Sequence, residues 1–290
     1  MNDEKIINAI KAISIAEISK AQSGHPGIAL GAAPILYTLY NKHMNIDVTD
    51  DKWINRDRFV MSAGHGSALL YATLYMSGFN LSINDLKNFR QIDSITPGHP
   101  EYGITPGVDA STGPLGQGIA NAVGMAAAEK YLSEKFNNLL DYKVYALCGE
   151  GDLMEGISYE ACSLAGNLKL GNLIVLYDSN GVTLDADANK TFDEDVLKRF
   201  DAMGWHLVAD GNNPILIDMA ISKAKRRTDK PSFIEIKTII GKDSILQGTN
   251  KVHGSPLTKE DIRQLKDKLK LDTNLFANIS SLRKEMANFI

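Results

Sequence analysis

The residues that first suggest chemistry lie in the stretch CGEGDLMEG, residues 148–156. It follows an apolar run, YKVYAL, and precedes an amphipathic run, ISYEACSLAGNLKL. The stretch is therefore predicted to be the turn between a strand and a helix. Backbone N–H groups at a helix start carry partial positive charge, and glycine lets a diphosphate approach the main chain. Glu150 would face the same anion, which requires either a cation between the two or another role for the loop.

A second polar cluster supports the cation. The run NLIVLYDSNGV ends in Asp178, Ser179 and Asn180, and parallel strands deliver their carboxyl ends to the same edge of a sheet. The Glu150 carboxylate, the Asn180 amide oxygen and the Val182 carbonyl are hard oxygen ligands of the kind that Mg²⁺ or Ca²⁺ takes together with phosphate oxygens. The alternative is that Glu150 is an ordinary acid at a helix start, favoured by the helix dipole.

The histidines are the second chemical signal. Four of the six lie in glycine-containing turns: His25, His65, His99 and His253. Loops of this kind often carry functional side chains, although each imidazole taken alone could be a solvated or packing residue. His43 and His206 have apolar neighbours and are interpreted as packing residues. The four turn histidines are too far apart in the sequence for a zinc motif.

The elements that must position these residues indicate an α/β fold with a mostly parallel sheet and helices on both faces. Buried strands separated by helical segments are typical of parallel pairing. The strand candidates are RFVMS, YKVYALC, NLIVLYDSN and SFIEIKTII. A helix over DEKIINAIKAISIAEISKAQ is expected to stop at SGHPG, and the Gly- and Pro-rich segment 91–118 is expected to be a long loop.

Composition excludes several classes of protein. The chain has 290 residues, a net charge of -4 and no basic block, which argues against nucleic acid or an anionic membrane as a partner. Cys148 and Cys162 lack CxxC spacing, and no signal peptide or bilayer-spanning run is recognised, so a cytoplasmic location is expected. An NAD site is disfavoured because GEGDLM has Met154 where a dinucleotide fingerprint has its third glycine.

Six motifs, in this order, resemble the amino-terminal, diphosphate-binding domain of transketolase. They are SGHPG, GHGSALLY, TPGHPE, STGPLGQG, GEGDLMEG with Asn180 about thirty residues on, and KVHGSPL. The resemblance runs from about residue 3 to 265. It implies a thiamine diphosphate-binding fold and an enzyme that transfers a two-carbon ketol unit between a ketose phosphate and an aldose phosphate, in which the cofactor carries the difficult chemistry.

The resemblance also implies a role for each matching residue. Glu150, Asn180 and the Val182 carbonyl would hold the cation, as a rule Mg²⁺. The diphosphate would be approached by the Gly151 N–H, His65 and His253. The aminopyrimidine would be met by the backbone of Gly113 and Leu115. The substrate channel would be lined by His25, His99 and His253, which bind hydroxyls and move protons.

Two departures from the family pattern concern this site. The family has Gly-Asp-Gly where this chain has Gly-Glu-Gly, and the extra methylene of Glu150 moves the carboxylate by roughly 1 Å, which favours Ca²⁺ or Mn²⁺ over a near-ideal octahedral Mg²⁺. The loop GKDSILQGTN has Lys242 and Asp243 where the family usually has an aromatic residue and a glycine, which puts closure over the cofactor in question.

Length is the third departure. A complete transketolase is more than twice as long, so residues 1–265 are expected to form the diphosphate-binding domain, and 266–290 a charged helical tail or the start of a linker. The chain would hold half of an active site and need a pyrimidine-binding, carboxyl-terminal half, in a homo- or hetero-oligomer. A subunit of a split enzyme, a piece of a longer chain and a catalytically idle interaction or regulatory protein with an impaired metal site are the alternatives.

Overall fold

A single five-stranded sheet forms the centre of the molecule in a computed structural model that describes residues 3–270 and 279–287. All of its strand pairs are parallel, and the strand order is β1-β2-β3-β5-β4. The strands are β1 Arg58–Met61, β2 Val144–Cys148, β3 Leu173–Ser179, β4 His206–Gly211 and β5 Ser232–Lys237. The predicted α/β class with a parallel sheet is confirmed.

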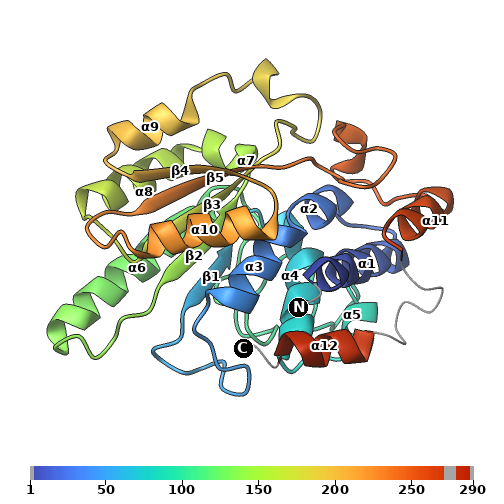
Figure 1. The fold of residues 1–290 in the computed structure, drawn as a ribbon, viewed down its shortest axis with the longest axis horizontal. Helices are drawn as coiled ribbons and strands as arrows, with labels where there is room; N and C mark the ends of the chain where they lie inside the picture. Colours follow the sequence, from blue (N-terminus) through green and yellow to red (C-terminus); the bar gives the residue numbers. More distant parts are fainter. Residues whose placement is uncertain (1–2, 271–278, 288–290) are drawn as a thin grey trace.

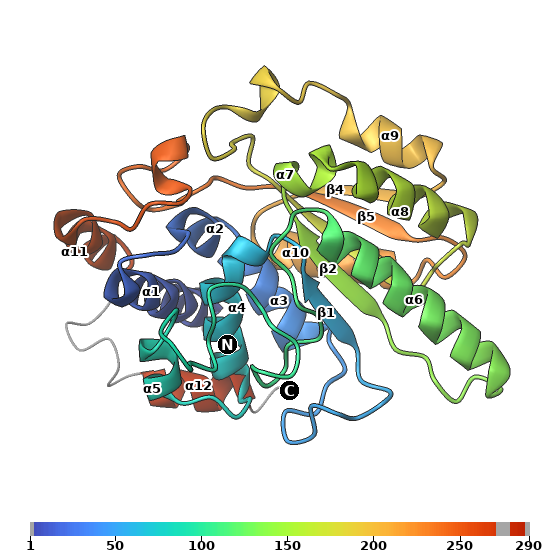
Figure 2. The same ribbon diagram turned by 180° about the vertical axis from the view of Figure 1, so that it is seen from behind.

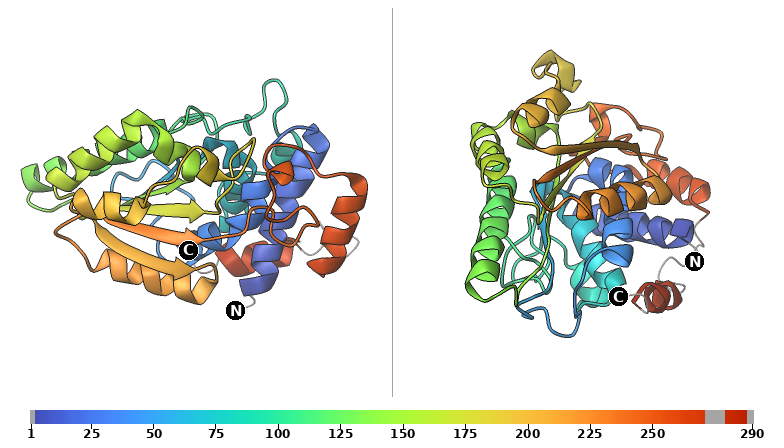
Figure 3. Two further views of the ribbon diagram at one scale, coloured as in Figure 1. Left: turned by 90° about the horizontal axis from the view of Figure 1, so that it is seen from above. Right: turned by 60° about the vertical axis from the view of Figure 1, so that its left-hand side comes forward.

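Helices cover both faces of this sheet (Figure 1). The α-helices are α1 Asp3–Ala21, α2 Pro26–Gly31, α3 Ala33–Lys42, α4 Ser67–Ser77, α5 Ile83–Lys87, α6 Gln117–Lys135, α7 Glu150–Met154, α8 Gly156–Asn167, α9 Val196–Ala202, α10 Pro214–Lys225, α11 Lys259–Lys268 and α12 Ile279–Ala287. Seen from behind, α6 and α8 lie side by side across the sheet (Figure 2). The right-hand view of Figure 3 separates them from α3, α4 and α10, which lie on the other side of the sheet.

Alternation along the strands explains the two layers, because successive side chains of a strand point to opposite faces. In β2, Tyr145 and Leu147 pack in the core with α1, α3, α4 and α10. Val144, Ala146 and Cys148 pack in a second core with α6, α8 and α9. With both faces buried, the strand has no polar side and reads as a continuous apolar run.

The strand β4 is the element that the sequence prediction misses. The segment between β3 and β5 was expected to be helical, but it contains α9, β4 and α10. The strand lies at the edge of the sheet and pairs only with β5 among the described strands. His206 and Leu207 are partly exposed there, so the strand lacks the continuous apolar run by which the central strands are recognised.

Segments that follow β1, β2, β3 and β5 meet at the carboxyl ends of these strands, together with the end of the long loop before α6. The short 3₁₀ helix η1, Gly64–Gly66, follows β1, and α7 follows β2 directly. The predicted long loop ends at Gly116, since α6 begins at Gln117. The segment after β5 leads to the 3₁₀ helix η3, Asn250–Val252. None of the helices in 3–270 and 279–287 is long and apolar enough to cross a membrane.

Candidate functional site

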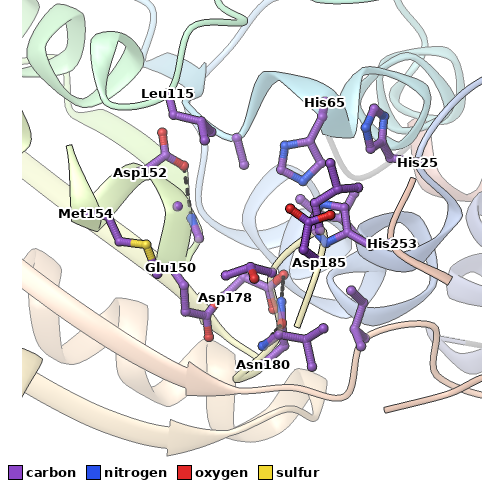
Figure 4. A pocket seen from close by; sticks show the side chains of 18 of the residues that line it. His25, His65, Leu115, Glu150, Asp152, Met154, Asp178, Asn180, Asp185 and His253 are labelled. Carbon is purple, nitrogen blue, oxygen red and sulfur yellow. Dashed lines mark hydrogen bonds between the residues drawn. The ribbon is translucent and has the colours of Figure 1, made fainter. Parts of the chain in front are cut away.

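A cavity of about 410 Å³ lies where these loops meet (Figure 4). Three of its histidines come from separate parts of the chain: His25 precedes α2, His65 lies in η1, and His253 follows η3. Two acids and an amide from the ends of β2 and β3 lie on another side of the cavity: Glu150, Asp178 and Asn180. Residues from separate sequence motifs therefore converge on one cavity.

Glu150 and Asn180 come together as predicted from the parallel sheet. The Glu150 Oε1 accepts a hydrogen bond from the backbone N–H of Gly181 at 2.6 Å. The Asn180 Oδ1 accepts from the N–H of Val182 at 3.0 Å, and the Asn180 Nδ2 donates to Asp178 Oδ2 at 3.2 Å. The two loops are thus joined through the polar groups that could bind a cation.

The charges of this group fit a hard divalent cation. Burial, and after it the nearby Asp178 carboxylate, raise the pKa of Glu150 to about 7. Burial also raises the pKa of Asp178 to about 6. Neither carboxylate forms an ion pair within the described residues. Two adjacent buried acids without a basic partner are destabilised when both are ionised, and a cation would relieve this cost.

Side chains of three or more His, Cys, Asp or Glu residues do not gather into a metal-binding group within 3–270 and 279–287. A cation at this place would therefore depend on amide and carbonyl oxygens in addition to Glu150, which is the donor set of Glu150, Asn180 and Val182. Such a mixed oxygen set suits Mg²⁺, Ca²⁺ or Mn²⁺.

Asp152 is not part of this group. Its Oδ1 accepts from Ser62 Oγ at 2.6 Å and from the Gly116 N–H at 2.9 Å, and its Oδ2 accepts from the Gly149 N–H at 3.0 Å. One buried carboxylate thereby joins the ends of β1 and β2 to the start of α6. Sequence reasoning missed this role, because the partners are distant in the chain and carry no motif of their own.

The three cavity histidines form a close cluster. The ring centroids of His25 and His65 are 5.0 Å apart, those of His65 and His253 are 5.2 Å apart, and those of His25 and His253 are 5.9 Å apart. The rings of His65 and His253 are stacked. The Nδ1 atoms of His25 and His253 are buried and have no hydrogen-bond partner among the described residues. A polar ligand in the cavity is one partner that would satisfy such buried nitrogens.

These imidazoles are uncharged at neutral pH. Burial, and after it His253, Arg90 and His99, lower the pKa of His25 to about 4. Burial, and then His25, lower the pKa of His65 well below its ordinary value. Burial lowers the pKa of His253 as well, against the opposing effect of Asp185. Neutral imidazoles both donate and accept hydrogen bonds, so the cluster suits a ligand rich in hydroxyl groups.

The remaining predicted residues lie around the same space. Leu115, Gly113 and Gly151 line the cavity. A Cβ on Gly151 would lie 2.9 Å from Leu115 Cδ1, so the two residues are in close contact. His99 is not among the cavity-lining residues of the described chain, and packs against Gly113, where a Cβ would lie 3.4 Å from its Cγ.

The loop after β5 is held by a contact that the sequence does not suggest. Lys11 of α1 donates to Asp243 Oδ2 at 2.7 Å, and the side chain of Lys11 is only 6% exposed. Asp243 has a left-handed φ of 75°. Its neighbour Lys242 is exposed. The loop is therefore fastened to α1 ten residues before His253.

The other two histidines lie away from the cavity. His43 is buried after α3, with its Nε2 3.0 Å from Asp218. His206 begins the edge strand β4. Neither is among the residues that line the cavity.

The fold and the site define an α/β domain that holds its ligand at the carboxyl ends of parallel strands. Comparison with known proteins identifies the family: the model of the transketolase thiamine diphosphate binding domain matches residues 2–288, and the chain belongs to this family. The thiamine diphosphate-binding fold that was predicted is thus confirmed.

Individual relatives agree with this result. The transketolase of Bacillus subtilis is 56% identical over 272 residues, and the match covers 91% of this chain and 41% of the relative. That of Aquifex aeolicus is 53% identical over 272 residues, covering 92% and 39%. The chain spans about 40% of the length of these curated relatives, and corresponds to their amino-terminal part.

Solved structures of transketolases are also similar to this chain. Transketolase from Campylobacter jejuni superposes with a TM-score of 0.91 at 44% identity, covering 100% of this chain and 48% of the other. Transketolase from Leishmania mexicana has a TM-score of 0.92 at 42% identity, covering 99% and 45%.

Proposed function

We propose that this chain forms one half of the active site of a thiamine diphosphate- and cation-dependent transketolase. The enzyme would transfer a two-carbon ketol unit from a ketose phosphate to an aldose phosphate. The observation that carries the proposal is the convergence of His25, His65 and His253 with Glu150 and Asn180 on one cavity, in a chain of this family.

Glu150, Asn180 and the Val182 carbonyl are the proposed cation ligands, with Mg²⁺ as the expected cation and Ca²⁺ or Mn²⁺ as alternatives. A divalent cation there would neutralise the Glu150 and Asp178 carboxylates together with a bound diphosphate. The raised pKa values of both acids support this assignment, because they reflect a negative charge that lacks a partner.

The cofactor itself is proposed to lie along the cavity. When bound, thiamine diphosphate would supply a nucleophilic carbon and an electron sink, which allow a C–C bond within the sugar to be broken or formed. The Gly151 N–H, His65 and His253 would bind the diphosphate, and the backbone of Gly113 and Leu115 would meet the aminopyrimidine. Gly151 and Leu115 are in close contact and both line the cavity, which supports their binding neighbouring parts of one cofactor.

The substrate is proposed to meet His25, His99 and His253. A neutral imidazole can donate to one sugar hydroxyl and accept from another, and it can take up a proton when an alkoxide or carbonyl requires it. The unpaired Nδ1 atoms of His25 and His253 support this role.

A second half is part of the proposal, since the chain spans about 40% of its curated relatives. A pyrimidine-binding, carboxyl-terminal half would complete the site in a homo- or hetero-oligomer. The tail or linker expected over 266–290 lies partly outside the described residues. Sugar phosphates are the proposed substrates and the cytoplasm the proposed location.

The test is a ketol-transfer assay of the chain mixed with a transketolase carboxyl-terminal half, thiamine diphosphate and Mg²⁺. His253→Asn in the same mixture is expected to lower kcat/KM by roughly a hundredfold, the usual size of a general acid–base contribution. Glu134→Ala, at an exposed position on α6, is the control and should keep full activity. No transfer by the unmodified mixture, with thiamine diphosphate bound, would favour a catalytically idle relative.

A further inference from the structure

Arg90 lies between two of the turns that carry the proposed substrate-binding histidines. Its Nη1 donates to Ser23 Oγ at 2.7 Å, two residues before His25. Its Nη2 donates to the Gly98 carbonyl at 3.3 Å, directly before His99. A single guanidinium thus bridges two segments that lie more than seventy residues apart in the sequence.

The bridge is built into the local backbone. Arg90 has a φ of 60°, a conformation that is unfavourable for a side chain of this size and persists only where the surroundings impose it. Its own N–H donates to the Thr96 carbonyl at 3.0 Å, and the preceding Phe89 is 1% exposed. A Cβ on Gly98 would lie 3.3 Å from Arg90 Nε, so the turn fits closely against the guanidinium.

Residues of α4 hold the same turn from the other side. Ser67 Oγ donates to the Gly98 carbonyl at 2.7 Å, and Tyr71 Oη donates to the His99 carbonyl at 3.2 Å. Arg90 is thus a polar link between the His25 turn and the His99 turn, because it donates to a residue of each.

The charge of Arg90 acts on both imidazoles. It lowers the pKa of His99 after burial, which is the larger cause, and it lowers the pKa of His25 after burial and His253. The other charged or titratable groups that influence His25 are His253 and His99, and His25 in turn influences His65. The positive charge of Arg90 therefore adds to burial in keeping the two imidazoles neutral and able to accept hydrogen bonds.

We propose that Arg90 is a positioning residue that fixes the His25 and His99 turns relative to each other, so that both imidazoles face one substrate. The substrate role of the two histidines rests on the proposed function. Arg90 is not among the residues that line the cavity in the described part of the chain, so it acts through the turns and not by contact with the cofactor.

Two substitutions separate geometry from charge. Arg90→Lys keeps the positive charge but loses the planar guanidinium that donates to two turns at once. Arg90→Met loses both the charge and these donors. In the reconstituted enzyme, both variants are expected to lower kcat by roughly tenfold to a hundredfold, the cost of a misplaced catalytic group, with thiamine diphosphate affinity and Tm nearly unchanged. Arg263→Met, an exposed change on α11, is the control.

Imidazole titrations by NMR on the chain alone provide the second readout. The pKa values of His25 and His99 are expected to rise in Arg90→Met and to stay near their original values in Arg90→Lys. Full kcat in Arg90→Lys would overturn the positioning role. If Tm and cofactor affinity fall together with kcat, the role of Arg90 is structural and the positioning role is overturned. If the unmodified mixture has no activity, the proposed function fails. Independently of activity, unchanged pKa values of His25 and His99 in Arg90→Met would contradict the proposed role of Arg90.

Discussion

The Glu150 carboxylate accepts the backbone N–H of Gly181 at 2.6 Å and so joins the loop after β2 to the loop after β3. A shorter aspartate at this position would not reach as far, and its carboxylate would remain nearer the start of α7. The extra methylene therefore draws the acid toward the β3 loop, where Asn180 and the Val182 carbonyl also lie.

The first prediction concerns this side chain. Glu150→Asp is expected to raise the affinity for Mg²⁺ relative to that for Ca²⁺, because Mg²⁺ demands shorter, near-octahedral coordination. Glu150→Gln removes the charge and is expected to weaken cation-dependent thiamine diphosphate binding by tenfold or more. Titrations of the cofactor at several Mg²⁺ and Ca²⁺ concentrations measure both effects. Equal affinity in Glu150→Gln would exclude Glu150 as a ligand.

The second prediction concerns Gly151. An alanine there would put its Cβ 2.9 Å from Leu115 Cδ1 and displace a side chain of the cavity wall. Gly151→Ala is expected to weaken thiamine diphosphate binding about tenfold, with little loss of unfolding free energy, because Leu115 is only partly buried. Gly124→Ala is the matched control, since a Cβ there meets nothing within 4 Å and should stabilise α6 by up to about 1 kcal/mol. An unchanged cofactor affinity in Gly151→Ala would place the cofactor elsewhere.

The third prediction concerns the fastening of the loop before His253. Asp243→Asn leaves the buried ammonium of Lys11 without a counter-charge, and should lower the unfolding free energy by about 2–4 kcal/mol. Lys11→Met together with Asp243→Asn should recover part of that loss, because the uncompensated charge is then gone. Urea unfolding of the single and double variants measures the coupling. The exposed neighbour Lys242→Ala should change stability by less than about 0.5 kcal/mol. Additive losses in the double variant would show that the two side chains are not coupled.

The fourth prediction concerns Glu17, a residue of α1 outside the candidate site. Burial raises its pKa well above the ordinary value, and both carboxyl oxygens have no hydrogen-bond partner in the described residues. The folded state therefore holds a proton that the unfolded state releases. The stability linked to this proton is complete below the unfolded pKa and is lost as pH rises toward the folded pKa.

Glu17→Met should for this reason stabilise the chain by about 1–3 kcal/mol at pH 8 and by less at pH 5. Urea unfolding at the two pH values measures the difference. Glu134→Met, at an exposed position on α6, should show no such dependence on pH. A gain from Glu17→Met that is the same at both pH values would mean that Glu17 is not held in its neutral form.

The parts of the site that could be predicted from the sequence are those that short, local sequence patterns indicate. Apolar runs locate the central strands, and the parallel arrangement then brings Glu150 beside the Asn180 loop. Histidines in glycine turns locate the cluster. The edge strand β4 was missed because partial exposure removes its apolar run. Asp152, Arg90 and the Lys11 to Asp243 pair were missed because each acts through partners far away in the sequence, and no local pattern records such contacts.

The most direct test of the central claim is a calorimetric titration of thiamine diphosphate, with Mg²⁺ and then Ca²⁺, into this chain mixed with a transketolase carboxyl-terminal half. Saturable binding that requires the cation and is lost in Glu150→Gln is the expected result. Cofactor binding that appears only in Glu150→Asp would contradict the account, because it would mean that Glu150 has disabled the cation site of this chain.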